Sequence, residues 1–139
     1  MAATVRACDL TLVFDGGSLG NPGKGYGSFH LADRAGFETI ERLEFGNNVT
    51  NNQAEYRIMI AGVEAALRHC SRTGLNPMSQ SICVQTDSKL VVEQVNGRWK
   101  VKHPDLQPLC LRARQLLSQF GWKRLTWQPR AETVKLLGH

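Results

Sequence analysis

The chain has 139 residues, 42% of them hydrophobic, which is typical of a folded domain with its own core and excludes a disordered chain. Lysine and arginine outnumber aspartate and glutamate by 17 to 12, so the net charge is +5 and a polyanionic partner is favoured. No apolar run approaches the ~18 residues that a membrane span needs.

The first half of the chain predicts three strands. Asp9–Asp15 is apolar and β-branched or aromatic, as strands are, and Gly16–Gly25 is rich enough in glycine to predict a loop. Tyr26–Ala32 alternates in polarity and predicts a second strand, followed by turn residues in Asp33–Gly36. Phe37–Phe45 also alternates, but neither of its faces is cleanly apolar, which predicts an edge strand.

Helices and strands then alternate. Thr50 and Gln53 form a capping-box pattern at the start of a helix, whose apolar residues recur at helical spacing as far as Leu67. Gly74–Gln80 predicts a loop. The remaining elements are predicted in this order: a strand at Ser81–Thr86, a helix capped by Asp87 or Ser88 and running to Val95, an irregular basic segment at Gly97–Pro104, a helix at Leu106–Phe120, a strand at Trp122–Gln128 and the start of a helix at Ala131–Leu137.

This order of elements predicts an α/β fold. Strands joined by short connections should pair antiparallel, whereas strands reached through a helix should add in parallel by right-handed crossovers. We therefore expect a mixed five-stranded sheet flanked by helices, in a single domain over residues 1–139.

The four cysteines give no metal-binding pattern. Cys8, Cys70, Cys83 and Cys110 contain no C-x-x-C pair, so no zinc site is predicted. Cys83 and Cys110 lie on apolar stretches and are expected to be small core residues. Their spacing does not resemble a secreted disulfide scaffold and Met1–Asp9 has no apolar signal segment, so we expect a reduced, cytoplasmic protein that does not contact a membrane.

Three carboxylates are candidates for one site. Asp15 ends the first strand, Asp87 follows the fourth, and Glu55 lies one turn into the first helix. The carboxyl ends of parallel neighbouring strands lie at one edge of a sheet, so these side chains are expected to converge. Taken singly, Asp15 is also explained as a turn residue, Asp87 as a helix N-cap and Glu55 as a solvated acid in a first helical turn.

A cluster of three carboxylates requires a cation. Mg²⁺ prefers oxygen ligands and shares its coordination shell with water and substrate phosphate. Two such ions about 4 Å apart can activate a water and stabilise the leaving oxygen of a phosphodiester.

The segments around these acids carry a resemblance to a known family. Phe14–Gly23, Thr50–Tyr56 and Thr86–Val91 resemble the three signature motifs of type 1 ribonuclease H, in the same order, and Val91–His103 resembles the short bacterial and archaeal branch. The resemblance implies a ribonuclease H-like fold with sheet order 3-2-1-4-5 and the first three strands antiparallel. It also implies metal-dependent endonucleolytic cleavage of the RNA strand of RNA–DNA hybrids, leaving 3′-hydroxyl and 5′-phosphate ends.

Backbone amides and short polar side chains suit the reading of RNA 2′-hydroxyl groups across a minor groove. By resemblance, the family's groove-contacting positions are Gly16, Gly17, Ser18, Asn21, Asn51, Asn52, Gln53 and Ser88, and Thr50 matches a contact to a DNA phosphate. The alternatives are hairpin geometry for the glycines and helix-start chemistry for the two asparagines.

A basic segment is a second candidate contact. Trp99, Lys100 and Lys102, together with Arg98 and His103, combine positive charge with an aromatic ring, which suits a phosphate backbone. The alternative is a solvated basic loop with a half-buried tryptophan.

The C-terminal motif departs from the family. Alignment on Pro129-Arg130 places Leu137 where the family has a fourth acid, and leucine cannot bind Mg²⁺. His139 could replace that acid as a ligand or proton shuttle, which would favour Mn²⁺. Otherwise three carboxylates suffice with reduced activity, or the domain binds hybrids without cutting them. Arg130 matches the arginine that the short branch uses in place of a catalytic histidine, with a plain surface arginine as the alternative.

The prediction is a Mg²⁺-dependent ribonuclease H, with Mn²⁺ as a possible substitute and an RNA–DNA hybrid as partner. The alternative is a weakened or inactive hybrid-binding domain. A monomer is expected, with dimerisation as the alternative if apolar sheet surface is left uncovered.

Overall fold

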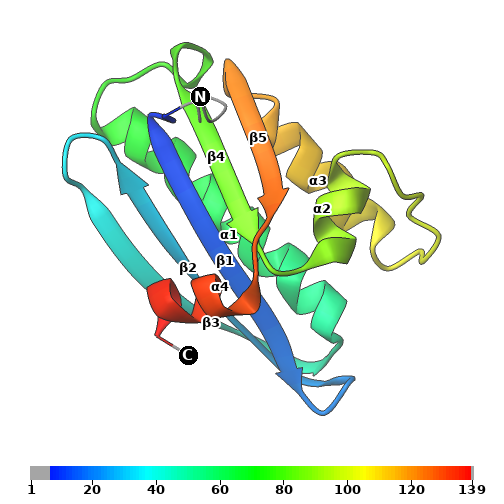
Figure 1. Ribbon diagram of the computed structural model, residues 1–139. Coiled ribbons are helices and arrows are strands. Elements are labelled where there is room, and N and C mark those ends of the chain that lie inside the picture. Colours follow the sequence, from blue (N-terminus) through cyan, green and yellow to red (C-terminus); the bar gives the residue numbers. More distant parts are fainter. Residues whose placement is uncertain (1–6, 139) are drawn as a thin grey trace, which may run out of the picture.

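A computed structural model describes residues 7–138 and contains the predicted mixed sheet, in the order β3-β2-β1-β4-β5 (Figure 1). β2 pairs antiparallel with both β1 and β3, whereas β4 pairs parallel with both β1 and β5. The predicted ribonuclease H-like topology is therefore confirmed. The strands are β1 (Leu10–Leu19), β2 (Gly23–Asp33), β3 (Glu38–Val49), β4 (Ser81–Thr86) and β5 (Trp122–Trp127).

Helices lie on both faces of this sheet (Figure 1). The long helix α1 crosses one face and the short helix α4 lies on the other. The predicted capping box of α1 is present, because Thr50 Oγ1 accepts from Gln53 N at 3.1 Å and Gln53 Oε1 accepts from Thr50 N at 2.9 Å. The helices are α1 (Asn51–Arg72), the 3₁₀ turn η1 (Pro77–Ser79), α2 (Lys89–Val95), α3 (Gln107–Leu117) and α4 (Arg130–Leu137).

The prediction of a glycine-rich loop after Asp15 was wrong. β1 continues to Leu19 and β2 begins at Gly23, so only the three residues between them turn the chain. The glycines serve close packing: Gly16 is paired with Gly27, and a Cβ on Gly27 would lie 2.7 Å from Ile58 Cβ. Glycine therefore lets α1 approach the sheet closely here.

The edge position predicted for the third strand is confirmed. β3 lies at one end of the sheet and runs to Val49, beyond the predicted end at Phe45. The extension carries Gly46 and Asn48 at positive φ values of 84° and 60°, conformations that glycine and asparagine adopt most readily.

The core lies between α1 and the sheet and extends under α2 and α3. Leu12, Phe14 and Tyr56 are fully buried there. The Tyr56 hydroxyl donates to Gln94 Oε1 at 2.8 Å, which satisfies a buried amide oxygen and links α1 to α2. This bond fixes the start of α1, where Glu55 lies, against the helix that follows Asp87.

The expectation of reduced cysteines was wrong for two of the four. Cys83 is buried as predicted, but it forms a disulfide with Cys8, which lies just ahead of β1. Cys70 and Cys110 are buried free thiols. The sequence spacing hid the bond because 75 residues separate Cys8 from Cys83, and only the parallel pairing of β1 with β4 brings them together.

Across residues 7–138, no helix has both the length and the apolar character required to cross a membrane.

Replacing Tyr56 with phenylalanine tests the buried link between α1 and α2. Tyr56→Phe leaves Gln94 Oε1 without its donor at a buried position, so we expect the free energy of unfolding to fall by about 1–3 kcal/mol. Urea unfolding measures the loss. Tyr26→Phe, at an exposed tyrosine on β2, is the matched control and should change stability by less than about 0.5 kcal/mol. Equal effects of the two changes would contradict the assigned role.

Candidate active site

Three carboxylates converge where β1, β4 and α1 meet. Each of Asp15, Glu55 and Asp87 offers a carboxylate oxygen, and these atoms all lie within 4.8 Å of one another. β1 and β4 are parallel neighbours, so Asp15 within β1 and Asp87 just after β4 reach the same region of the sheet. Three oxygen donors at this separation form a donor set that fits Mg²⁺.

Gly16 allows Glu55 to join the two strand residues. A Cβ at Gly16 would lie 2.7 Å from the Ala54 carbonyl group and from Glu55 N. The backbone of α1 therefore contacts the backbone of β1 directly beside Asp15. Any side chain at Gly16 would push the first turn of α1, and with it Glu55, away from the other two acids.

The position of α2 leaves Asp87 available to the cluster. Ser88, not Asp87, is the N-cap of α2, with its Oγ accepting from Val91 N at 3.4 Å. The Asp87 backbone is held instead, because Trp127 Nε1 donates to its carbonyl oxygen at 3.1 Å. Sequence reasoning missed Trp127, whose role depends on β5 lying beside β4.

The pKa of Glu55 is raised by its surroundings. Burial, together with the negative charges of Asp15 and Asp87, raises the pKa of Glu55 from its ordinary 4.5 to about 7. A hydrogen bond with Ser88 and the positive charge of Arg130 oppose the increase. In the metal-free protein, protonation of Glu55 near neutral pH relieves part of the repulsion within the cluster.

Arg130 supplies a positive charge beside the two aspartates. It begins α4, and its Nη1 lies 3.3 Å from Asp87 Oδ2 and 3.9 Å from Asp15 Oδ2. The exposed guanidinium thus bridges the carboxylates of the two aspartates.

Three of the predicted groove-contacting residues, Ser18, Asn21 and Asn51, form one hydrogen-bonded set. Asn51 Oδ1 accepts from Ser18 N at 2.8 Å and from Ser18 Oγ at 3.1 Å, while Asn21 Oδ1 accepts from Asn51 N at 3.1 Å. These bonds join the β1–β2 hairpin to the start of α1. Asn52 is exposed beside them, and Gly17 is buried in β1, where a Cβ would lie 2.8 Å from the Tyr26 hydroxyl oxygen.

A pocket of about 290 Å³ joins the start of α1 to the segment between α2 and α3. His103 and Asp105 line it opposite Thr50. The sequence predicts His103 only as part of the basic segment, because nothing in the sequence places it near Thr50. The complete lining is Asn21, Thr50, Asn52, Gln53, His103, Asp105 and Leu106.

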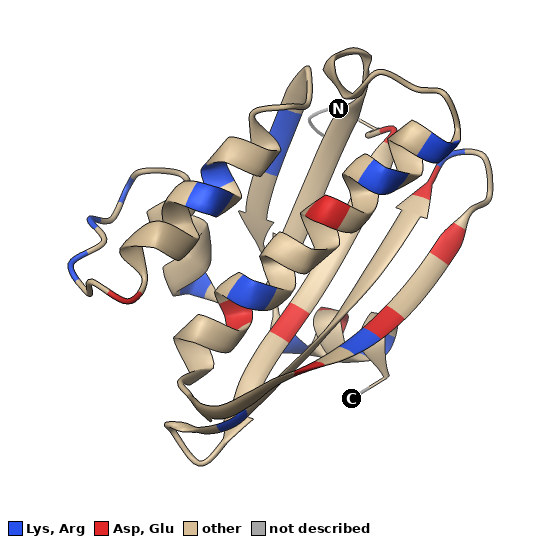
Figure 2. Cartoon of the chain, turned by 180° about the vertical axis from the view of Figure 1, so that it is seen from behind, with Lys and Arg blue, Asp and Glu red and all other residues tan. Residues whose placement is uncertain are grey.

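The basic segment between α2 and α3 projects from the body of the domain (Figure 2). Trp99, Lys100 and Lys102 are exposed on it. Arg98 is not as available as expected, because its Nε and Nη2 donate to the two Glu93 carboxylate oxygens at 2.7 and 2.8 Å.

The position of the family's fourth acid is occupied by a buried leucine. Leu137 is only 1% exposed and packs with α4 on the sheet, and Arg42 Nη2 donates to its carbonyl oxygen at 3.0 Å. Thr133, at the family's asparagine position, is also buried and accepts from Gln128 Nε2 at 2.9 Å. His139, the predicted substitute, lies outside the described residues.

This sheet order, with three acids meeting beside the paired strands β1 and β4, defines a ribonuclease H-like domain. The family model described as reverse transcriptase-like matches residues 14–134. The chain also resembles the solved N-terminal RNase H domain of Rv2228c from Mycobacterium tuberculosis, with 37% identity, a TM-score of 0.80, and coverage of 94% of this chain and 88% of that one. The chain therefore belongs to the ribonuclease H family.

Two curated relatives are longer than this chain. It is 44% identical over 121 residues to the bifunctional protein Rv2228c of Mycobacterium tuberculosis, covering 86% of this chain and 31% of that protein. It is 37% identical over 118 residues to ribonuclease HI of Halobacterium salinarum, covering 85% of this chain and 55% of that protein. The chain thus spans about a third and about half of these relatives.

The pKa of Glu55 predicts a pH dependence of stability in the metal-free protein. Between pH 4.5 and about 7 the folded state keeps a proton that the unfolded state has released, so stability falls as pH rises through this window. Because Glu55 is partly exposed, we expect a loss on the order of 1–3 kcal/mol. Glu55→Gln should remove this pH-dependent loss of stability. In urea unfolding with EDTA present, the variant and the parent should have similar free energies of unfolding at pH 5, and the variant should be more stable at pH 7.5. A difference that does not change with pH would contradict this assignment.

Leu137→Asp tests whether a fourth acid can be restored. The new carboxylate would be buried on the sheet, where the Arg42 guanidinium already donates to the Leu137 carbonyl oxygen, so we expect the free energy of unfolding to fall by about 3–5 kcal/mol and metal affinity to stay unchanged. Leu136→Asp, at a 39% exposed position of the same helix, is the control and should cost less than about 1 kcal/mol. Tighter Mg²⁺ binding by a stable Leu137→Asp protein would show that this side chain reaches the site.

Proposed function

We propose that this domain hydrolyses the RNA strand of RNA–DNA hybrids with Mg²⁺ held by Asp15, Glu55 and Asp87. The convergence of these three carboxylates within 4.8 Å, in a ribonuclease H fold, carries the proposal. The names of the relatives, ribonuclease HI and an RNase H domain, support it. Mn²⁺ is expected to substitute, since it accepts the same oxygen ligands.

Two Mg²⁺ ions, when bound, supply a nucleophilic water and stabilise the leaving 3′-oxygen, giving 3′-hydroxyl and 5′-phosphate ends. The chain's own task is to hold the three acids in place. Ser88 hydrogen-bonds Glu55, the Trp127 indole holds the Asp87 carbonyl, and the Gly16 contact keeps the first turn of α1 beside Asp15. Arg130, 3.3 Å from Asp87, is positioned to meet the negative charge of the scissile phosphate.

The hydrogen-bonded set at the hairpin is suited to recognise the RNA strand. Because Asn51 Oδ1 already accepts from Ser18, the Asn51 amide NH₂ remains to donate to a 2′-hydroxyl or a base edge. Gly16, Gly17, Asn52, Gln53 and Ser88 are proposed to complete this groove contact, as the resemblance implies.

The DNA strand is proposed to lie along the Thr50 pocket and the basic segment. The Thr50 hydroxyl accepts from Gln53 N, yet its own proton can still be donated to a phosphate, so capping and binding do not compete. Trp99, Lys100 and Lys102 extend a positive surface from the same pocket, which also contains His103.

A second function is favoured by one observation. The buried Leu137 leaves the cluster with three acids where the family has four, so a domain that binds hybrids without cutting them is the alternative. The cleavage and binding experiment described next separates these two functions.

Cleavage of a hybrid with a labelled RNA strand, in Mg²⁺ and separately in Mn²⁺, tests the proposal. Asp15→Asn should reduce the cleavage rate by on the order of 100-fold or more. Loss of a residue that only hydrogen-bonds a metal ligand already lowers metal affinity or activity by about 10–100-fold, and Asp15 is proposed to be a ligand itself. Glu64→Gln removes an acid of the same helix α1 that pairs with Arg112 at 3.3 Å, and it should cut at the parent rate.

Duplexes of DNA alone and of RNA alone, with the same sequence, are the substrate controls and should remain intact. Retained hybrid binding without cleavage in either metal would establish the non-cutting alternative. A protein that neither binds nor cleaves the hybrid would overturn both proposed functions.

A further inference from the structure

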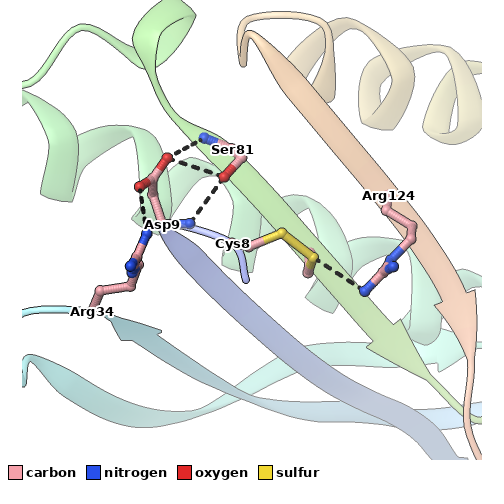
Figure 3. The surroundings of a disulfide bond; sticks show 6 residues. Cys8, Asp9, Arg34, Ser81 and Arg124 are labelled. Carbon is pink, nitrogen blue, oxygen red and sulfur yellow. Dashed lines mark hydrogen bonds and ion pairs between the residues drawn. A yellow bond between two sulfur atoms is a disulfide. The ribbon is translucent and has the colours of Figure 1, made fainter. Parts of the chain in front are cut away.

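The Cys8–Cys83 disulfide joins the segment ahead of β1 to the middle of β4, on the sheet face that carries α4 (Figure 3). The two Cα atoms are 5.8 Å apart, within the range that a disulfide spans. Cys8 and Cys83 are 5% and 7% exposed, while Ala7 beside Cys8 is exposed. Both cysteines are therefore buried, and Cys8 is directly preceded by an exposed residue.

An arginine lies against one of the two sulfurs. Arg124 is the register partner of Cys83 on β5, and its Nη2 is 3.6 Å from Cys83 Sγ (Figure 3). Arg124 Nε is buried, and within residues 7–138 it has no hydrogen-bond partner. The guanidinium carbon also lies 5.8 Å from the centre of the Trp122 ring. This cation is thus directed at the disulfide, with no carboxylate recorded beside it in the described chain.

On the Cys8 side of the bond, the charged groups are already paired with other partners. Asp9 follows Cys8 directly, and its carboxylate accepts from Ser81 N at 2.9 Å and from Ser81 Oγ at 3.0 Å. Arg34, from the turn between β2 and β3, lies 3.9 Å from the same carboxylate. The Asp9 carboxylate is thus occupied by Ser81 and Arg34, whereas Cys83 Sγ has a guanidinium against it, so the two sulfurs are not equivalent as leaving groups.

We propose that Cys8 and Cys83 form a reversible redox pair, in which Arg124 stabilises the Cys83 thiolate and makes it the leaving group when a dithiol reductant attacks Cys8. A positive neighbour favours a thiolate, and a stabilised thiolate leaves faster and raises the share of the reduced form at equilibrium.

The exchange balances with a dithiol as the co-reactant. A thiolate of the reductant attacks Cys8 Sγ, the Cys8–Cys83 bond breaks, and its electron pair leaves on Cys83 Sγ beside Arg124. The second thiol of the reductant then displaces Cys8 from the mixed disulfide, and Cys8 takes up a proton. Two electrons pass to the protein and the reductant becomes a disulfide.

The fold offers a reason for the pair to open without loss of the sheet. The Asp9–Ser81 hydrogen bonds join the same two segments and do not involve sulfur, with Asp9 N also donating to Ser81 Oγ at 3.0 Å. The disulfide itself closes a loop across 75 residues, so its loss frees the unfolded chain. Reduction should therefore lower the melting temperature by on the order of 10 °C while the domain stays folded at 25 °C.

The test is a redox titration of the full chain in defined ratios of reduced to oxidised glutathione. Free thiols are trapped with N-ethylmaleimide and assigned by peptide mass spectrometry, which separates Cys8 and Cys83 from Cys70 and Cys110. Arg124→Gln should shift the equilibrium towards the disulfide by on the order of tenfold. Arg124→Lys, which keeps the charge, should stay near the parent. Arg112→Gln, at an exposed arginine of α3, is the matched control and should not shift it.

Alkylation rates provide a second measurement that does not depend on cleavage of any substrate. In a Cys8→Ser background, Cys83 should react with iodoacetamide at lower pH than it does in the Cys8→Ser, Arg124→Gln double variant. An Arg124→Gln titration equal to the parent, a Cys83 reactivity independent of Arg124, or a pair that stays reduced in oxidised glutathione would each overturn the proposal.

Discussion

The parallel pairing of β1 with β4 is the constraint on which the rest of this structure depends. It places Asp15 and Asp87 at one edge of the sheet, although 72 positions separate them in the chain, and it fixes the direction from which α1 must approach. Only a backbone without a side chain at Gly16 permits the approach that brings Glu55 to the same point. One strand pair and one glycine therefore assemble the carboxylate cluster.

Bringing three acids together costs free energy, and the chain offsets this cost locally. Arg130 lies across the two aspartates, and burial raises the pKa of Glu55 to about 7, so the cluster need not hold three negative charges when no metal is bound. Metal binding would then compete with a proton on Glu55 and with the Arg130 ion pairs. The affinity of the site for a cation is thus set both by the three carboxylates and by Arg130, which is not a metal ligand.

The sequence predicted the elements from local patterns such as strand alternation and a capping box, and the family resemblance implied the sheet order. The three acids were predicted to converge and do so, although Asp15 lies within β1 and not at its end as predicted. The sequence failed where the outcome depends on contacts between distant segments. The glycines after Asp15 were assigned to a loop, since nothing local shows that α1 packs on them. The contact of His103 with the Thr50 pocket, the Trp127 bond to Asp87 and the Cys8–Cys83 bond were likewise invisible before the sheet order was known.

The same strand pair connects the carboxylates to the disulfide, and the geometry limits what that connection can do. Cys83 is the partner of Thr11 in the β1–β4 ladder, and the pairs Leu12–Val84 and Val13–Gln85 lie between that position and the acids. The disulfide therefore ties β4 to the segment ahead of β1, two residue pairs away from the region where the acids repel one another. Opening it therefore affects chiefly the entropy of the unfolded chain, while the hydrogen-bonded ladder continues to fix the separation of Asp15 and Asp87. The redox state of Cys8 and Cys83 would thus set the stability of the domain. The carboxylates would set the chemistry of the folded state.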